Sequence, residues 1–218
     1  MKGKDSRVVI ATGGQWGPDD HALIAKDDFV IGVDGGNDEL LQRNITPHLA
    51  VGDFDTAQLE RVEALRSLGV PVEQLPRDKD VTDTDYAVTK ALQRQPKEVL
   101  LLGAWGTRWD HTLANVNLLE RIERAGVRGV MQNYLNRMEL VGPGQHVVRR
   151  QHYHYMSMIA WQGAVKGIHL SGFRFPLVDA TLERMSSLAI SNEWIGESGT
   201  VKLREGKLLI IQSRDMVC

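Results

Sequence analysis

Short apolar runs alternate with stretches of helical spacing over the first 132 residues of the chain. The runs carry hydrophobic side chains on both faces, which is typical of strands in a parallel sheet that helices cover. Such strands are predicted at residues 7–14, 29–33, 70–75, 98–103 and 127–132, with a shorter apolar stretch at 49–51. Helices are predicted at residues 19–26, 37–43 and 56–68. Two further helices are predicted, one that begins at Thr82 and another that ends near Arg124. The alternation of strands and helices predicts a parallel α/β fold.

The pattern changes after about Asn136, where glycines separate short apolar segments. These segments include residues 155–161, 188–191, 200–203 and 207–212. Short strands with frequent glycine turns are typical of an antiparallel β domain. We therefore expect a second domain of this kind, with a boundary between residues 134 and 146.

Acidic residues gather where the predicted strands end and the helices begin. Asp53 and Asp55 are two residues apart in an extended segment, so their side chains project from the same face while Phe54 turns into the core. The other acids in such positions are Asp34, Asp80, Asp83 and Asp110. Ligands of open α/β sheets bind beyond the carboxyl ends of the strands, so these residues predict a functional site. For the pair Asp53 and Asp55 by itself, a polar loop in which Asp55 or Thr56 caps the next helix is the alternative.

Carboxylates that converge in this way repel one another unless a cation or a shared proton lies between them. Mg²⁺ prefers oxygen ligands and commonly binds one or two carboxylates together with substrate phosphates. Arg77, Lys79 and Arg108 lie among the acids and can bind the remaining phosphate oxygens. The residues therefore suggest metal-assisted phosphoryl transfer. For Arg77 and Lys79, a solvated run of charges is the alternative.

Composition narrows the classes of protein that fit. The chain has 218 residues, of which 42% are hydrophobic and 25% are charged, and this is ordinary for a globular protein. A net charge of −2 gives no reason to expect nucleic acid or a membrane surface as a partner. No apolar run approaches membrane-spanning length, and the one cysteine, Cys218, excludes an internal disulfide. We therefore expect a cytoplasmic protein.

Several familiar motifs are missing or weak. The chain has neither a G-x-x-x-x-G-K-[ST] loop nor a G-x-G-x-x-G motif, which argues against a P-loop kinase and an ordinary dinucleotide-binding enzyme. We interpret Gly13-Gly14 and Gly103–Gly106 as tight turns rather than phosphate cradles. His146, His152 and His154 invite a zinc site, but no nearby thiol or carboxylate completes the ligand set, which favours a structural role.

Two further groups of residues have the chemistry to face a ligand. His111 and Asn115 continue the apolar face of the helix that ends near residue 124, so this end of the helix should be buried or face a ligand. In the β domain, Ser191 and Asn192 offer donors and acceptors, and Trp194 can stack on a flat heterocycle. An ordinary Ser-Asn turn is the alternative for the second group.

Taken together, these motifs resemble those of the thiamine pyrophosphokinase family. The matching stretches run in order along nearly the whole chain: VDGGND (33–38), HLAVGDFDT (48–56), RDKDVTDTDYAV (77–88), LLGAWGTRWDHTLANVNLL (101–119), SGFRFPL (171–177) and ISNE (190–193). The combination of GDFDT, KDxTDxD and RxDHxxxN is specific, although no single element is. Thr107, where many relatives have glycine, departs from the pattern, as do the bulky Trp105 and Trp109, and this affects the expected shape of the loop.

The resemblance implies an α/β domain at residues 1–138 that binds ATP and Mg²⁺, and an antiparallel β-sandwich at 139–218 that binds thiamine. It implies transfer of a diphosphoryl group from ATP to the hydroxyl of thiamine, in a homodimer with active sites between the subunits. By position it gives catalytic roles to Arg108 and to three carboxylates that also bind the metal: Asp53, Asp55 and Asp80. The residues that it implies for ATP are Asp34, Lys79, Thr82, Asp83, Arg108, Asp110 and His111, and those for thiamine are Ser191, Asn192 and Trp194.

Two other functions stay open at this point. A related Mg²⁺-dependent transferase could act on another alcohol acceptor, such as a pterin. A non-catalytic sensor could bind thiamine or a nucleotide without releasing AMP. The number of mutually repelling carboxylates argues against the sensor, because a binding module has no need of them.

Overall fold

The structure is a computed structural model that describes residues 6–54 and 59–216 of the chain. It divides between Tyr134 and Leu135 into two compact units. The strands of the first unit pair in parallel and those of the second pair antiparallel. The fold classes predicted for the two parts of the chain are therefore confirmed.

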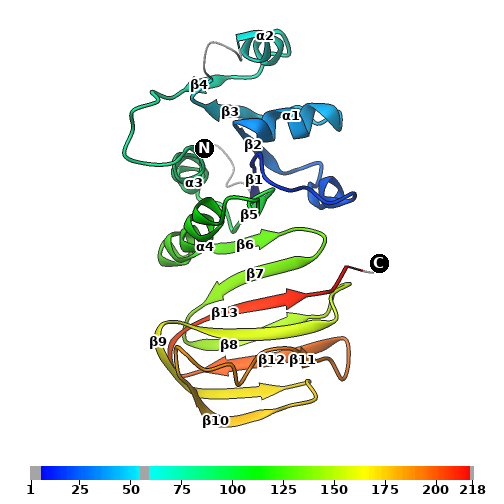
Figure 1. Ribbon diagram of the computed structural model, residues 1–218, viewed down its shortest axis with the longest axis vertical. Coiled ribbons are helices and arrows are strands. Elements are labelled where there is room, and N and C mark those ends of the chain that lie inside the picture. The colour runs from blue at the N-terminus through cyan, green and yellow to red at the C-terminus, as the bar shows by residue number, and fades with distance from the viewer. Residues whose placement is uncertain (1–5, 55–58, 217–218) are drawn as a thin grey trace. The chain divides into compact units, whose positions relative to one another are not determined.

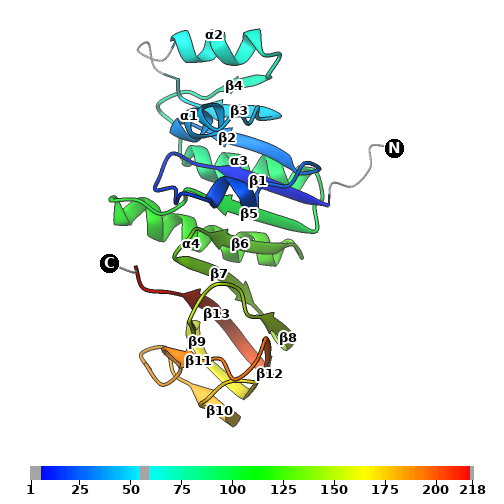
Figure 2. The ribbon, with the colours of Figure 1, turned by 90° about the vertical axis from the view of Figure 1, so that its right-hand side faces the viewer.

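The first unit is built on a parallel sheet. Its strands lie in the order β4 (Val72–Gln74), β3 (Leu49–Gly52), β2 (Phe29–Val33), β1 (Arg7–Ala11), β5 (Glu98–Leu102) and β6 (Arg128–Gln132), as Figure 2 shows. The chain runs outward from β1 to β4 and then returns to the other side of β1 as β5. The strand order thus reverses between β1 and β5, and such a switch point is where ligands bind in open α/β sheets.

Helices cover both faces of this sheet. They are α1 (Gly35–Gln42), α2 (Leu59–Ser67), α3 (Asp83–Gln93) and α4 (Trp109–Arg124). Figure 1 shows α3 and α4 on one face of the sheet and α1 on the other. On the helical face predicted for α4, Leu118, Leu119 and Ile122 are buried, whereas His111 at its start is exposed. In the part of the chain that the structure describes, no helix is long and apolar enough to cross a membrane.

The helix predicted for residues 19–26 is instead a single 3-10 turn, η1 (Asp20–Leu23). Side chains satisfy backbone N–H groups on both sides of this turn. The Asp20 carboxylate accepts from the Gly17 amide at 2.7 Å, and the Asp28 carboxylate accepts from the Ala25 amide at 2.7 Å. Such local bonds compete with the continuation of a helix, so the prediction was wrong about its length.

Two predictions at the carboxyl edge of the sheet are confirmed. Phe54 turns into the core and is only 2% exposed. Thr82 is the N-cap of α3, and its hydroxyl accepts the amide of Asp85 at 3.2 Å. The cap satisfies one of the free N–H groups in the first helical turn and fixes where α3 begins.

The second unit is an antiparallel β domain. Its strands lie in the order β7 (Asn136–Val141), β13 (Glu205–Ser213), β9 (Tyr155–Ser171), β12 (Ser198–Leu203) and β8 (Gly144–Arg149), while β10 (Leu177–Leu182) and β11 (Asn192–Glu193) also pair with β9. Residues 155–161 of β9 pair with β13, whereas residues 165–170 pair with β10. β9 therefore takes part in both layers of the domain.

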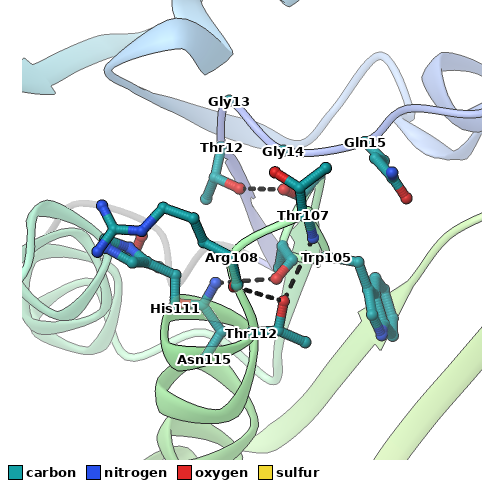
Figure 3. A pocket seen from close by; sticks show the side chains of 14 residues that line it. Thr12, Gly13, Gly14, Gln15, Trp105, Thr107, Arg108, His111, Thr112 and Asn115 are labelled. Atoms are coloured by element: carbon teal, nitrogen blue, oxygen red, sulfur yellow. Dashed lines mark hydrogen bonds between the residues drawn. The ribbon is translucent and has the colours of Figure 1, made fainter.

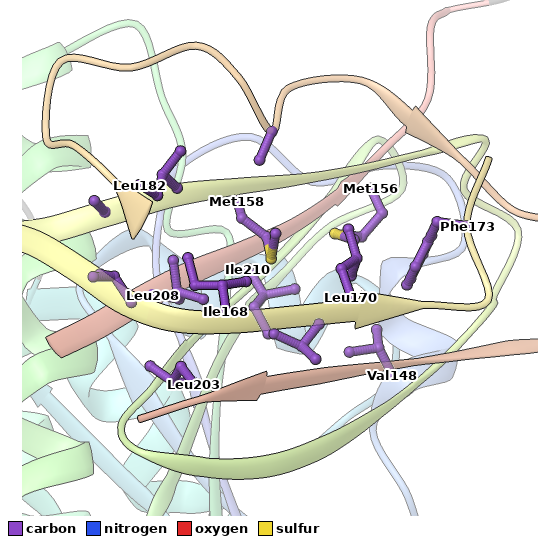
Figure 4. Close-up of a cluster of buried hydrophobic side chains, with 14 residues drawn as sticks. Val148, Met156, Met158, Ile168, Leu170, Phe173, Leu182, Leu203, Leu208 and Ile210 are labelled. Atoms are coloured by element: carbon purple, nitrogen blue, oxygen red, sulfur yellow. The ribbon is translucent and has the colours of Figure 1, made fainter. Parts of the chain in front are cut away.

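The two halves of β9 contribute side chains to one core, which Figure 4 shows. Met156 and Met158 come from the first half, and Ile168 and Leu170 come from the second. Each of these four side chains is at most 2% exposed. Burial of such a side chain stabilises a domain by roughly 1.5–3 kcal/mol. The shared core confirms the β-sandwich that the family resemblance implies.

Candidate active site

The carboxyl ends of β1, β2, β3 and β5 lie along one edge of the first unit. Glycines let the segments after these strands approach one another closely. A Cβ atom on Gly14 would lie 2.0 Å from the carbonyl oxygen of Trp105, and one on Gly36 would lie 2.0 Å from that of Ala11. No larger residue fits at either position. The turns after β1 and β5 are therefore in backbone contact.

A pocket of about 400 Å³ opens between these two turns and the start of α4, as Figure 3 shows. Thr12 Oγ1 donates to the carbonyl oxygen of Gly103 at 2.6 Å, and Asn115 Nδ2 donates to that of Ala104 at 2.9 Å. Both bonds hold the turn after β5 in place. The volume lies in the range of small-molecule sites. The lining consists of Thr12, Gly13, Gly14, Gln15, Thr84, Gly103, Ala104, Trp105, Gly106, Thr107, Arg108, His111, Thr112 and Asn115.

Three residues predicted to contact ATP lie together at the start of α4. Arg108 precedes the helix and donates to Asp110 Oδ2 at 2.6 Å. This hydrogen bond raises the pKa of Arg108 and lowers the pKa of Asp110, although both side chains are exposed. Arg108 and His111 line the pocket. The guanidinium of an exposed ion pair thus stands beside the pocket.

Asp34 lies at the carboxyl end of β2 among other charged groups. Its pKa is raised to about 6, first because burial disfavours the carboxylate and then because the carboxylates of Asp83 and Asp53 lie nearby. The backbone amide of Asp53 and the ammonium of Lys79 act in the opposite direction. Lys79 Nζ also lies 3.0 Å from Asp83 Oδ2. We call Asp34, Asp53, Asp83 and Lys79 the acidic cluster.

The acidic cluster adjoins the pocket. Gly35, next to Asp34, lies so close to Gly13 that a Cβ atom on Gly13 would be 3.0 Å from its Cα. Thr84, next to Asp83, lines the pocket directly. The structure thus brings charged residues from three separate loops to the rim of one recess.

The chemistry of the acidic cluster fits Mg²⁺ that phosphate oxygens help to bind. Oδ1 of Asp34 and Oδ1 of Asp83 are buried and have no hydrogen-bond partner among the described residues. A cation bound close to the cluster would relieve the repulsion between the carboxylates. Within residues 6–54 and 59–216, no three His, Cys, Asp or Glu side chains form a metal-binding group by themselves.

The remaining residues predicted for metal and phosphate have varied surroundings. Asp55 lies outside the described residues. Asp80 and Arg77 have exposed side chains in the segment before α3. Asp85 follows Asp83 by two residues in the same motif, but it forms an ion pair with Arg121 of α4. That ion pair links α3 to α4 and supports the helix that carries Asp83.

The residues predicted for thiamine lie in the second unit, where Asn192 is engaged by the backbone. Its Oδ1 accepts the Phe175 amide at 3.0 Å, and its Nδ2 donates to the Phe175 carbonyl oxygen at 2.8 Å. Ser191 is exposed and has a positive φ of 56°. Trp194 packs on Phe173 with ring centroids 4.6 Å apart, and its buried Nε1 has no hydrogen-bond partner among the described residues. Asn192 thus fixes the segment at Phe175. The exposed Ser191 directly precedes Asn192 in the chain.

Several residues of the pocket carry no strong signal in the sequence. Thr12, Gln15, Thr84 and Thr112 line it although their types and spacing form no motif. The glycine segments interpreted as tight turns also form its walls. Their position was the available signal, because they follow the two strands that flank the switch point. Asn115, which was expected to be buried or to face a ligand, does both.

Fold and site together define a class of two-domain enzymes in which an α/β unit binds a phosphorylated substrate at its switch point. Residues 21–131 match the model of the thiamin pyrophosphokinase catalytic domain, and residues 145–208 match that of the thiamin pyrophosphokinase vitamin B1 binding domain. The chain belongs to the thiamine pyrophosphokinase family. This family forms thiamine diphosphate and uses ATP as a substrate.

Individual relatives support this assignment. The chain is 31% identical to the thiamine pyrophosphokinase of Bacillus subtilis over 186 residues, which is 85% of this chain and 87% of the relative. A crystal structure of thiamine pyrophosphokinase from Bacillus subtilis aligns with a TM-score of 0.89 at 30% identity, covering 96% of this chain and all of the other. That of Geobacillus thermodenitrificans thiamin pyrophosphokinase aligns with a TM-score of 0.86 at 34% identity, covering 97% and 99%.

Proposed function

We propose that this protein transfers the diphosphoryl group of ATP to the hydroxyl of thiamine and releases AMP. The observation that supports this most strongly is the acidic cluster at the rim of the pocket. Its carboxylates repel one another, and the pKa of Asp34 is raised to about 6 as a result of burial and this repulsion. Such a cluster suits a cation and the phosphate oxygens that accompany it. The match to a vitamin B1 binding domain favours thiamine over another alcohol as the acceptor.

In this proposal, ATP lies with its nucleoside part in the pocket and its phosphates toward the acidic cluster. The residues that contact ATP are Asp34, Lys79, Thr82, Asp83, Arg108, Asp110 and His111, and the metal ligands are Asp53, Asp55 and Asp80. Lys79 and Arg108 suit phosphate oxygens, because ammonium and guanidinium groups form charge-assisted hydrogen bonds with them. When bound, Mg²⁺ would neutralise charge on the phosphate oxygens.

The reaction is an in-line displacement at the β-phosphorus of ATP. The thiamine hydroxyl oxygen forms a bond to the β-phosphorus. The bond from the β-phosphorus to the oxygen it shares with the α-phosphate breaks, and AMP leaves with that oxygen. The hydroxyl proton is released. The protein holds the two reactants in line, which removes much of the entropic barrier. Arg108 and Lys79 stabilise charge that develops on the phosphate oxygens.

Thiamine binds in this proposal at Ser191, Asn192 and Trp194. Asn192 acts by holding the Phe175 segment, while Ser191 and Trp194 contact the ligand. We further propose a homodimer with active sites between the subunits, on the strength of the family resemblance. A cytoplasmic location accords with a reaction that consumes ATP.

Product analysis with one pair of variants tests the proposed function. Wild-type protein with ATP, Mg²⁺ and thiamine should form thiamine diphosphate, and replacement of thiamine by a pterin alcohol should give no diphosphorylated product. Asp53→Asn should lower this activity by roughly 100-fold or more, since it removes a charge at the reacting phosphates. Asp27→Asn makes the same change at an exposed residue before β2. Asp27 lies at the amino end of this strand, whereas the candidate site lies at the carboxyl ends, so the activity should stay unchanged. Equal activity of Asp53→Asn and wild type would contradict the site assignment.

A further inference from the structure

Asp34 occupies a sharp turn between β2 and α1. Its φ of 48° and ψ of −121° lie in a region that residues with a Cβ atom rarely adopt. Glycines stand two residues before and two residues after it. A Cβ atom on Gly32 would lie 2.1 Å from Asn37 Oδ1, and one on Gly36 would lie 2.0 Å from the carbonyl oxygen of Ala11. This spacing matches the strained strand-to-helix turns that present a catalytic side chain in some hydrolases.

Hydrogen bonds on both sides hold Asp34 in this conformation. Its amide donates to the carbonyl oxygen of Val51, at the end of β3, at 2.9 Å. Its carbonyl oxygen accepts two bonds from Asn37, one from the backbone amide and one from Nδ2, each at 3.1 Å. The backbone of Asp34 is thus fastened to β3 and to the first turn of α1.

Asn37 is an unfavourable residue for stability alone. It is 2% exposed, and its Oδ1 has no hydrogen-bond partner among the described residues. A buried acceptor without a partner costs free energy, and this cost offsets the gain from the bond that Nδ2 donates. The side chain also requires glycine at position 32. These features indicate a role other than stabilisation of the fold.

We propose that Asn37 is a positioning residue for the reaction. Its side-chain amide holds the carbonyl of Asp34, and this keeps the strained turn in the one conformation that directs the Asp34 carboxylate toward Asp53 and Asp83. Asn37 acts through Asp34 and does not touch the reacting groups. The inference rests on the proposed function for its kinetic consequence, whereas its conformational consequence is independent of any activity.

Three substitutions at Asn37 test the kinetic consequence. Asn37→Ala removes the side-chain donor, Asn37→Asp keeps the shape without the donor, and Asn37→Ser keeps a hydroxyl that can donate to the carbonyl three residues earlier. Asn37→Ala and Asn37→Asp should lower kcat by roughly 10–100-fold and leave the KM for thiamine unchanged. Asn37→Ser should recover much of kcat. The melting temperature of Asn37→Ala without ligands should stay within roughly 2 °C of wild type. Wild-type kcat in Asn37→Ala, or no recovery in Asn37→Ser, would overturn the proposal.

A second experiment tests the turn without any substrate. Asp34→Gly and Asp34→Ala both lack the carboxylate, so the difference between their melting temperatures reports backbone strain. Asp34→Gly should melt roughly 3–6 °C higher than Asp34→Ala, and this difference should at least halve when Asn37→Ala is added, because the turn is then free to relax. Gln95, with a φ of 54° after α3, is the control. The difference between Gln95→Gly and Gln95→Ala should be the same with and without Asn37→Ala. If Asn37→Ala leaves the melting-temperature difference at Asp34 unchanged, the proposal is overturned, even if thiamine diphosphate is formed. If Asn37→Ala reduces this difference, the proposal is supported, even if the protein catalyses another reaction.

Discussion

Asp34 has three properties that are expected of a functional residue. It combines a left-handed φ of 48°, a buried oxygen without a partner among the described residues and a pKa of about 6. Each property is unfavourable to folding by itself. The raised pKa means that the folded state keeps a proton on Asp34 at pH values where the unfolded state has lost it. Stability therefore falls as the pH rises from about 4 to about 6, and the loss persists above that range.

Asp34→Asn should remove this pH-dependent loss. At pH 7.5, without metal or nucleotide, the variant should be more stable than wild type by about 1–2 kcal/mol, less than the full pKa difference because Asp34 is partly exposed to solvent. At pH 4 the gain should vanish, since protonated Asp34 is uncharged like asparagine. Thermal unfolding at both pH values checks this. A gain of the same size at pH 4 would show that the charge of Asp34 is not its cause.

At the scale of elements, the loops at the carboxyl edge of the sheet depend on direct backbone contact. Gly14 and Gly106 both line the pocket, but their surroundings differ. A Cβ atom on Gly14 would lie 2.0 Å from the carbonyl oxygen of Trp105, whereas the nearest atom to one on Gly106 would be 3.9 Å away. The first contact joins the turns after β1 and β5, so it determines the width of the pocket.

Gly14→Ala should force these two turns apart. We expect the KM for ATP to rise by at least about tenfold, because displacement of a binding loop weakens every contact that the loop makes. Gly106→Ala adds the same methyl group at ordinary van der Waals distance and should change the KM by less than about threefold. Steady-state kinetics of both variants checks this. Similar KM values for the two variants would contradict the pocket as the ATP site.

The N-terminal cap of α3 is a second element-scale feature with a measurable effect. Thr82 accepts the amide of Asp85 through its hydroxyl. Thr82→Ala should lower the free energy of unfolding by about 1 kcal/mol, and Thr82→Ser should be close to wild type because serine is an equally good cap. Urea unfolding measures both. A loss in Thr82→Ser equal to that in Thr82→Ala would assign the effect to the lost methyl packing.

Continuous apolar patterns made most elements of the first unit predictable. β2 has the predicted bounds, and β5 and β6 differ from theirs by one residue. The pattern could not show where side chains replace helical bonds, as Asp20 and Asp28 do around η1. It also could not show where two backbones touch. The acids of the site were predictable because they follow strands. The glycine walls and Asn37 were not predictable, because their roles depend on contacts between backbone segments.

Across the whole molecule, the proposed chemistry is divided between two units of the chain. The acidic cluster and the pocket belong to the first unit, and Ser191, Asn192 and Trp194 belong to the second. An active site between subunits in a homodimer predicts complementation between chains that are defective in different units.

Mixtures of Asp53→Asn and Trp194→Ala chains test this arrangement. Each variant alone should be nearly inactive. Equal amounts, unfolded and refolded together, should recover about a quarter of the wild-type rate, because half of the dimers then contain one site with both residues intact. Refolded mixtures of each variant with itself are the control. A mixture with no more activity than its components would contradict sites that are shared between subunits.

A labelling experiment shows whether the diphosphoryl group is transferred intact. ATP that carries ³²P in its γ-phosphate is incubated with thiamine, Mg²⁺ and the protein, and the products are separated by chromatography and identified by mass spectrometry. We expect labelled thiamine diphosphate and unlabelled AMP in equal amounts, with neither ADP nor thiamine monophosphate. ADP with labelled thiamine monophosphate, or AMP without thiamine diphosphate, would contradict it.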